Sequence, residues 1–212
     1  MSDAHVFDIS PPISTKLAVW PGDTPMSREV LLDMQRGDNL TLSTLRATCH
    51  LGAHADGPNH YGKNAVGVDA QSLEFYLGPC QVIAVDAQRG KRFDATSLQA
   101  EIRQPRVLLK TGTFPDPENW NDDFAALSPA LVDFLNGRGV RTVGVDTPSV
   151  DLFNDKQLSA HARFLAHNIA ILEGLVLREV PPGEYELIAL PLKLVGFDAS
   201  PVRAVLRTHT KP

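Results

Sequence analysis

A run of eleven residues contains the side chains of this 212-residue chain that are best suited to chemistry. It reads His50-Leu-Gly-Ala-His54-Ala-Asp56-Gly-Pro-Asn-His60, so three of the seven histidines lie close together around one aspartate. Imidazole and carboxylate groups are the usual nitrogen and oxygen ligands of zinc and similar divalent ions. The run therefore predicts a metal site. The alternative is a histidine-rich surface loop.

The backbone of this run must bend if its side chains are to share an ion. All four candidate ligands stand at even positions and would point to one face of a straight strand. At about 3.3 Å per residue, however, His50 and Asp56 would then stand roughly 20 Å apart. A helix is excluded by the two glycines and the proline of the run. We therefore expect the strand that ends near Cys49 to curl into a compact turn, which these residue types favour.

A second pair of candidate ligands, His161 and Glu173, lies farther along the chain. His161 falls early on a predicted helix, and Glu173 ends an apolar run. A carboxylate at the end of a buried strand requires a partner, because unpaired burial is costly. The residues leave two partners open, a metal ion or an arginine such as Arg163 or Arg178. His167, in the last turn of the same helix, is expected to be structural, because a partly charged imidazole there interacts favourably with the helix dipole.

Five further residues are candidates for the surroundings of the site. Trp20 offers an aromatic face for a substrate ring, or a hydrophobic anchor for its loop. Trp120 lies in a polar stretch, and we expect it to pin its loop rather than to edge the pocket. Asp146, Ser149 and Asp151 follow a predicted strand at its C-terminal end. They either orient ligand histidines or supply turn and capping chemistry.

The elements that must position these residues predict an α/β fold. Apolar runs and apolar alternation indicate strands over residues 6–10, 40–49, 80–86, 106–110, 140–146, 169–173, 185–191 and 204–208. Helices are predicted over residues 95–102, 128–136 and 159–167. The second helix has Ser128 as its N-cap and Pro129 at its first position, and Gly137 follows as a stop. Strands outnumber helices and alternate with them, which predicts one domain with a mixed sheet and helices packed outside.

Composition and charge narrow the class of protein. The length suffices for one substantial domain over residues 1–212. The net charge of −5 gives no reason to expect nucleic acid or an anionic membrane as a partner. Since neither a secretory leader nor an apolar stretch of about 18 residues is apparent, we expect a soluble cytoplasmic protein. In that compartment Cys49 and Cys80 are expected to be buried free thiols rather than a disulfide.

At the eleven-residue run the sequence resembles the cyclase family of metal-dependent hydrolases. The signature of that family is His-x-Gly-Thr-His-x-Asp-x-Pro-x-His, and Ala53 replaces the usual threonine here. The replacement removes a hydroxyl but no ligand. Other segments resemble the remaining landmarks of the family in the same order, and the resemblance covers nearly the whole chain. These segments are residues 7–10, 20–25, 144–151 and 161–173.

The resemblance implies a swivelling β/β/α-type fold, a homodimer and two zinc ions per subunit. Manganese or cobalt could occupy a site with the same nitrogen and oxygen ligands. It also implies that His50, His54 and Asp56 bind the first ion. The second ion would be bound by Asp56, His161 and Glu173, with Asp56 bridging the two ions.

The resemblance further implies that His60 is the proton donor and acceptor and that Trp20 lines the substrate pocket. Within the family, the segment Trp20-Pro-Gly-Asp-Thr-Pro25 and the chain length are most similar to the kynurenine formamidases. This similarity implies hydrolysis of N-formyl-L-kynurenine to kynurenine and formate in tryptophan breakdown. Two other interpretations remain open: hydrolysis of another small amide such as isatin, and a metal-binding protein without catalysis.

Overall fold

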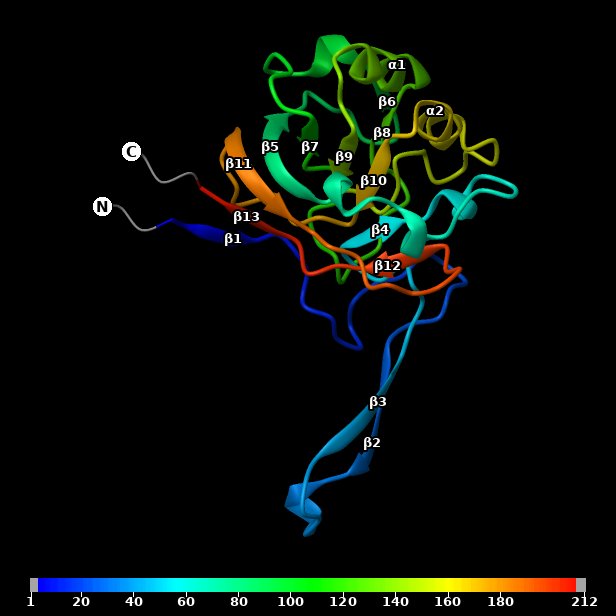
Figure 1. The fold of residues 1–212 in the computed structure, drawn as a ribbon, viewed down its shortest axis with the longest axis vertical. Helices are drawn as coiled ribbons and strands as arrows, with labels where there is room; N and C mark the ends of the chain where they lie inside the picture. The colour runs from blue at the N-terminus through cyan, green and yellow to red at the C-terminus, as the bar shows by residue number, and fades with distance from the viewer. Residues whose placement is uncertain (1–3, 209–212) are drawn as a thin grey trace.

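The computed structural model describes residues 4–208, and a nine-stranded sheet forms its centre (Figure 1). The strands are β1 (Val6–Asp8), β4 (His54–Asp56), β5 (Leu77–Ala84), β7 (Arg106–Lys110), β9 (Thr142–Val145), β10 (Ala170–Glu173), β11 (Gly183–Ile188), β12 (Ala199–Pro201) and β13 (Val205–Arg207). Across the sheet their order is β1-β13-β11-β5-β7-β9-β10-β4-β12. β5, β7, β9 and β10 run parallel, and the outer pairings are antiparallel. The predicted α/β class with a mixed sheet is confirmed.

Two α-helices lie on one side of this sheet and pack against each other (Figure 1). They are α1 (Pro129–Gly137) and α2 (Ser159–His167). α1 begins as predicted, because the Ser128 hydroxyl accepts a hydrogen bond from the Leu131 amide at 3.1 Å. It does not stop before Gly137, however, and the left-handed residue beyond its end is Gly139, with φ of 77°. α2 has the predicted bounds.

Apolar side chains alternate along the central strands and form two cores. On β7, Leu108 packs into one core and Leu109 into the other. The core that contains Leu109 is closed by the two helices, for example through Phe164. The other core joins Leu206, near one end of the sheet, to Ala55, near the opposite end. The sheet therefore curls around this core, which is built largely from its own strands.

The prediction of a helix over residues 95–102 is wrong. The chain forms only a short 3-10 helix, Ala95–Ser97, after which it is extended. Asp94 caps that helix as expected, since its carboxylate accepts from the Thr96 amide at 2.9 Å. Leu98 then forms a bridge with Val85 at the end of β5, and this pairing ends the helical course. The apolar spacing of the segment reflects packing against the helix-side core.

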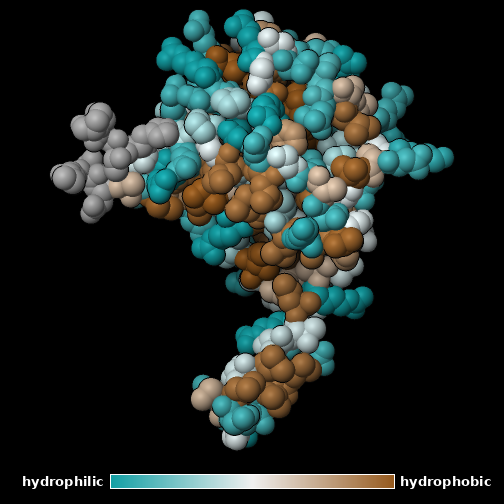
Figure 2. Space-filling view, viewed as in Figure 1, coloured by the Kyte–Doolittle hydropathy of each residue, from teal (hydrophilic) through white to brown (hydrophobic). Residues whose placement is uncertain are grey.

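The strand predicted over residues 40–49 exists but is not half-buried. It is β3 (Leu42–Arg46), all of whose residues are exposed, and it pairs with β2 (Ser27–Leu32) in a hairpin. The hairpin projects from the body as an arm, and apolar side chains gather on it (Figures 1 and 2). Met34 and Leu45 of the arm are 64% and 65% exposed. The alternation of leucine with polar residues therefore marks a surface that the body of the chain does not cover.

The remaining elements are short and lie mainly in the connections. They are β6 (Arg92–Phe93), β8 (Ala126–Leu127) and the 3-10 helices Met34–Arg36, Pro58–His60, Val68–Ala70 and Leu73–Phe75. Both cysteines are free thiols, as predicted, although only Cys80 is buried and Cys49 is partly exposed. Within residues 4–208, none of the helices has the length and apolar character needed to cross a membrane.

Candidate metal centre

The eleven-residue run folds as a turn, a strand and a short helix. Gly52 adopts a left-handed conformation, with φ of 58°, and reverses the chain after His50. His54–Asp56 then forms β4, which lies between β10 and β12. The turn brings His50 back over this strand, so its Nδ1 lies 3.2 Å from the Asp56 Oδ1. The predicted bend is confirmed, while the strand inside the run was not foreseen.

Four buried side chains converge where β4 and β10 pair. His54 Nε2 lies 3.4 Å from Asp56 Oδ1 and 3.4 Å from Glu173 Oε2. His161, from α2, places its Nε2 3.5 Å from Asp56 Oδ2 and 3.7 Å from Glu173 Oε1. Each carboxylate therefore offers one oxygen to each imidazole, and Asp56 lies between the two histidines.

Several polar atoms of this cluster are buried without a hydrogen-bond partner. They are His54 Nε2, His161 Nε2 and both carboxylate oxygens of Asp56. Buried polar atoms are normally paired, because leaving them unpaired costs free energy. Nitrogen and oxygen atoms of this kind are ligands for a divalent cation, which would satisfy all four. The residues present therefore fit a metal centre.

Each buried histidine is held by the ring nitrogen that faces away from the cluster. His54 Nδ1 lies 2.8 Å from the Gly52 carbonyl oxygen. His161 Nδ1 lies 2.7 Å from Asp151 Oδ2. When Nδ1–H donates to such an oxygen, the lone pair of Nε2 points into the cluster. This is how proteins orient imidazoles for metal binding.

The structure separates the roles of the three polar residues that follow β9. Asp151 orients His161 and also accepts from two backbone amides at the start of α2, at 2.9 and 3.0 Å. Asp146 instead accepts from the Thr111 amide at 3.0 Å, and Ser149 Oγ accepts from the Asp151 amide at 3.1 Å. Asp151 therefore orients a candidate ligand histidine, in agreement with the first of the two predicted alternatives, and it also caps the start of α2. Turn chemistry holds for Ser149, whereas Asp146 fits neither alternative, because it accepts from backbone amides of the segment after β7.

Glu173 lies in the cluster rather than against an arginine. Its Oε1 accepts from the Val150 amide at 2.7 Å, and within residues 4–208 it forms no ion pair with an arginine. Arg163 instead donates to Asp133 at 2.7 Å. His167 contacts the same Asp133 oxygen at 2.7 Å. The arginine alternative for Glu173 is therefore wrong, and His167 lies in the last turn of α2 with a partner of its own, as expected.

The charges of the cluster are balanced by protons when no cation is bound. Burial lowers the pKa of His54 and His161, but their carboxylate partners outweigh this effect and raise each pKa to about 10. Burial also raises the pKa of Asp56, yet the surrounding histidines lower it well below its usual range. Imidazolium protons therefore hold the carboxylates at neutral pH. A divalent cation would replace that positive charge, and its binding would release protons.

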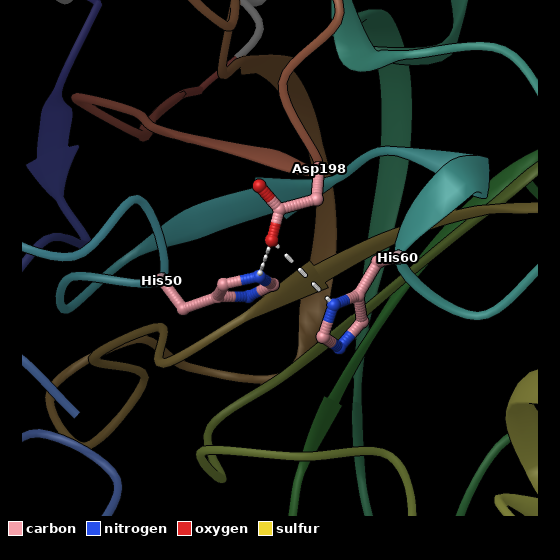
Figure 3. A group of neighbouring side chains, drawn as sticks. All are labelled: His50, His60 and Asp198. Atoms are coloured by element: carbon pink, nitrogen blue, oxygen red, sulfur yellow. Dashed lines mark hydrogen bonds and ion pairs between the residues drawn. The ribbon is translucent and has the colours of Figure 1, made fainter. Parts of the chain in front are cut away.

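His50 and His60 are more exposed than the four clustered side chains. Their rings lie side by side (Figure 3), with centroids 4.2 Å apart. Ligand atoms of His50, His54 and Asp56 lie within 4.8 Å of one another, as do those of Asp56, His60 and His161. Burial lowers the pKa of His60. Its imidazole is therefore neutral at neutral pH and can accept a proton.

Asp198 completes this side of the centre, and sequence reasoning missed it. It stands at the entry to β12, far from the histidine run in the sequence, and no motif marks it. Its Oδ2 lies 3.2 Å from His50 Nε2 and 3.8 Å from His60 Nδ1 (Figure 3). Only the antiparallel pairing of β12 with β4, which is not apparent from the sequence, brings it to the site.

A pocket of 490 Å³ opens beside the centre. Four of the candidate ligands, His50, His54, His161 and Glu173, form part of its wall. Such a volume suits a small-molecule ligand.

Aromatic rings form another part of the wall. Trp20 lines the pocket as expected, and its ring lies 5.3 Å from that of Trp120 in an edge-to-face contact. The prediction that Trp120 only pins its loop is wrong. Its Nε1 donates to Asp122 at 2.5 Å within the loop, but packing on Trp20 places its ring in the pocket wall as well.

Residues 7–152 match the family model described as "Putative cyclase", which covers more than half of the chain. Solved structures share the fold at low sequence identity. A potential metal-dependent hydrolase with cyclase activity is 23% identical, with a TM-score of 0.84 over 99% of this chain and 100% of that one. A predicted metal-dependent hydrolase from Bacillus stearothermophilus is 24% identical, with a TM-score of 0.81 over 98% and 100%. Isatin hydrolase A from Labrenzia aggregata is 20% identical, with a TM-score of 0.83 over 98% and 94%. With the family match and this fold, the chain belongs to the cyclase family.

Proposed function

We propose that this chain is a metal-dependent hydrolase of a small aromatic amide. The observation that carries the proposal is the buried cluster of His54, Asp56, His161 and Glu173, whose unpaired ligand atoms lie beside a pocket lined by aromatic rings. A purely structural metal site is normally closed, whereas a catalytic one keeps an open position. The pocket favours the catalytic alternative over a metal-binding protein without activity.

We propose N-formyl-L-kynurenine as the substrate, with kynurenine and formate as products. Trp20 and Trp120 offer aromatic faces to its ring. Asp23 and Arg178 line the same pocket, and their charges complement the ammonium and carboxylate groups of the amino acid part. The second candidate is isatin, a neutral cyclic amide. It is favoured by the fold shared with isatin hydrolases, and it would leave these two charged residues without a role.

The ligand set supports the two-ion assignment from the family resemblance. His50, His54 and Asp56 would hold one ion, and Asp56, His161 and Glu173 would hold the second. Zinc suits these ligands, and manganese or cobalt could replace it. A metal centre of this kind lowers the pKa of bound water and polarises a carbonyl oxygen, which provides a nucleophile at neutral pH.

His60 would move the proton during hydrolysis. Its neutral imidazole can accept a proton from the attacking water, whose oxygen adds to the formyl carbon. The bond between that carbon and the aniline nitrogen then breaks, and His60 returns the proton to the nitrogen. Trp20 would hold the aromatic ring against the pocket wall meanwhile. The sum of these steps is amide plus water giving formic acid plus amine, and the acid ionises to formate and a proton.

We also propose that the chain forms a homodimer through the arm. A two-stranded hairpin is marginally stable in water, and exposed leucines on it favour contact with another surface. A second copy of the chain would cover them. The free thiols of Cys49 and Cys80 fit the reducing cytoplasm that we propose as its location.

The proposal is tested by measuring turnover of N-formyl-L-kynurenine and isatin side by side on one purified sample. We expect activity to disappear after chelation and return with zinc, with a higher kcat/KM for the formamide. A higher kcat/KM for isatin would move the assignment to the cyclic amide. Full activity after complete metal removal would contradict metal-dependent hydrolysis altogether.

A further inference from the structure

We propose that Asp198 is a positioning residue, which holds the metal ligand His50 and the proton carrier His60 through one carboxylate oxygen. The part that concerns His60 rests on the proposed function. The part that concerns His50 rests only on the geometry of the metal centre. Asp198 would therefore connect the first histidine of the eleven-residue run, His50, with the last one, His60.

The backbone of Asp198 is fixed to the strand that carries the ligands. Its carbonyl oxygen accepts from the Gly57 amide at 2.7 Å. The next residue, Ala199, stands directly opposite Asp56 in the pairing of β12 with β4. The side chain of Asp198 is 51% exposed. Its backbone, however, is held in place by the same strand pairing that holds the backbone of Asp56.

The contact with His50 completes a pattern shared by three histidines of the centre. His54 has the Gly52 carbonyl as acceptor for its outward nitrogen, and His161 has Asp151. For His50 the outward nitrogen is Nε2, and the acceptor is Asp198 Oδ2 at 3.2 Å. A proton held on Nε2 leaves the Nδ1 lone pair directed at the Asp56 side of the cluster, where it can serve as a ligand.

The same oxygen also lies close to His60, and its negative charge favours a proton on the nearer ring nitrogen. Its Nδ1 lies 3.8 Å from Asp198 Oδ2, and the other ring nitrogen lies on the far side of the ring (Figure 3). A proton attracted to Nδ1 leaves Nε2 as the basic nitrogen. One carboxylate oxygen therefore lies near both rings, within hydrogen-bond distance of His50 Nε2 and 3.8 Å from His60 Nδ1.

A competing assignment makes Asp198 a metal ligand. Ligand atoms of His50, His60 and Asp198 lie within 4.8 Å of one another and could hold an ion of their own. We favour positioning, because His50 already directs Nδ1 at Asp56, 3.2 Å away. The number of ions bound at saturation separates the two assignments.

The test compares Asp198→Ala and Asp198→Asn with Asp69→Asn as a matched control. Asp69 accepts from the Gly196 amide at 2.9 Å and so supports the same loop. It is absent from the ion pairs that the described residues make with His50 and His60. Any effect of a loosened loop should therefore appear in all three variants, whereas loss of positioning should appear only at Asp198.

We expect zinc affinity, measured by chelator competition, to fall about 10- to 100-fold in Asp198→Ala. Asp198→Asn, which keeps an acceptor oxygen, should recover part of the loss, and Asp69→Asn should match the parent. Nitrogen NMR of the zinc-loaded protein should show Nε2–H on His50 and Nδ1–H on His60 in the parent, and mixed tautomers in Asp198→Ala. kcat should fall with little change in KM, and the fall should shrink in a His60→Ala background.

The proposal is overturned if Asp198→Ala retains the parent tautomers and zinc affinity. It is also overturned if the variant binds one ion fewer at saturation, since Asp198 would then be a ligand. If the parent hydrolyses neither amide but the affinity and tautomers change as expected, the proposed function fails. The positioning of His50 then stands.

Discussion

At the scale of single residues, Asp56 and His60 divide the chemistry of the centre. Asp56 is fully buried and lies between two histidines with both oxygens unpaired, which suits a shared ligand. His60 is the most exposed histidine of the centre, and burial lowers its pKa, which favours the neutral imidazole. Asp56 is thus suited to bind cations, and His60 is suited to accept and donate a proton.

Replacing Asp56 with alanine should disturb the binding of both ions, because within residues 4–208 no other carboxylate contacts His50, His54 and His161 together. Elemental analysis of the purified variant should show less metal than the parent, and turnover should fall at least about 100-fold. Asp133→Ala, on the far helix surface, serves as the control for loss of a carboxylate. A variant that retains its full metal content would contradict the bridging role.

Replacing His60 with alanine should leave metal content unchanged and lower kcat by about 10²- to 10⁴-fold, the usual contribution of a positioned acid–base group. His167→Ala is the matched control, since that imidazole pairs with Asp133 outside the centre. Steady-state kinetics with metal analysis on each variant provide the test. Parent-like kcat in His60→Ala would refute the proton-carrier role, and a loss of metal would make His60 a ligand.

At the scale of elements, the sequence predicted those whose signals are local. β7 and α2 have the predicted bounds, because an uninterrupted apolar run and a helical apolar spacing each define an element without distant partners. The metal run was found for the same reason, since its four side chains lie within eleven residues. Prediction failed where pairing is non-local. The short strand β4, the bridge that ends the 3-10 helix after Asp94, and Asp198 all depend on partners far along the chain.

The arm gives a prediction at this scale. If it forms the dimer contact, the double substitution Met34→Ser and Leu45→Ser should convert the protein to a monomer while its metal content stays unchanged. Light scattering coupled to gel filtration measures the mass of each species. Leu73→Ser, which alters an exposed leucine of the body, is the control. A parent protein that is already monomeric at micromolar concentration would contradict the homodimer.

At the scale of the whole molecule, the metal centre joins helix α2 to the paired strands β4 and β10. Its ligands come from the turn before β4, from β4 itself, from α2 and from the end of β10. These ligands come from segments that are far apart in the sequence, between His50 and Glu173. Metal binding should therefore stabilise the fold as well as supply chemistry, because the unfolded chain cannot present the same ligands together.

Removing the metal should accordingly lower the thermal midpoint of unfolding. At a free zinc concentration 100 times the dissociation constant, binding to the folded state alone contributes about 2.7 kcal/mol. Calorimetry of the chelated and zinc-loaded protein measures the difference. The Asp56→Ala variant should show a smaller shift on zinc addition. Equal midpoints for both forms of the parent would mean that the centre does not bind zinc in the folded state.

Anomalous diffraction at the zinc edge from zinc-loaded crystals would show whether the buried cluster is a metal centre. We expect anomalous density in contact with Asp56, with His54 Nε2 and His161 Nε2 as nitrogen ligands at about 2.0–2.1 Å. Density found only at surface histidines, with the cluster of His54, Asp56, His161 and Glu173 empty, would contradict it.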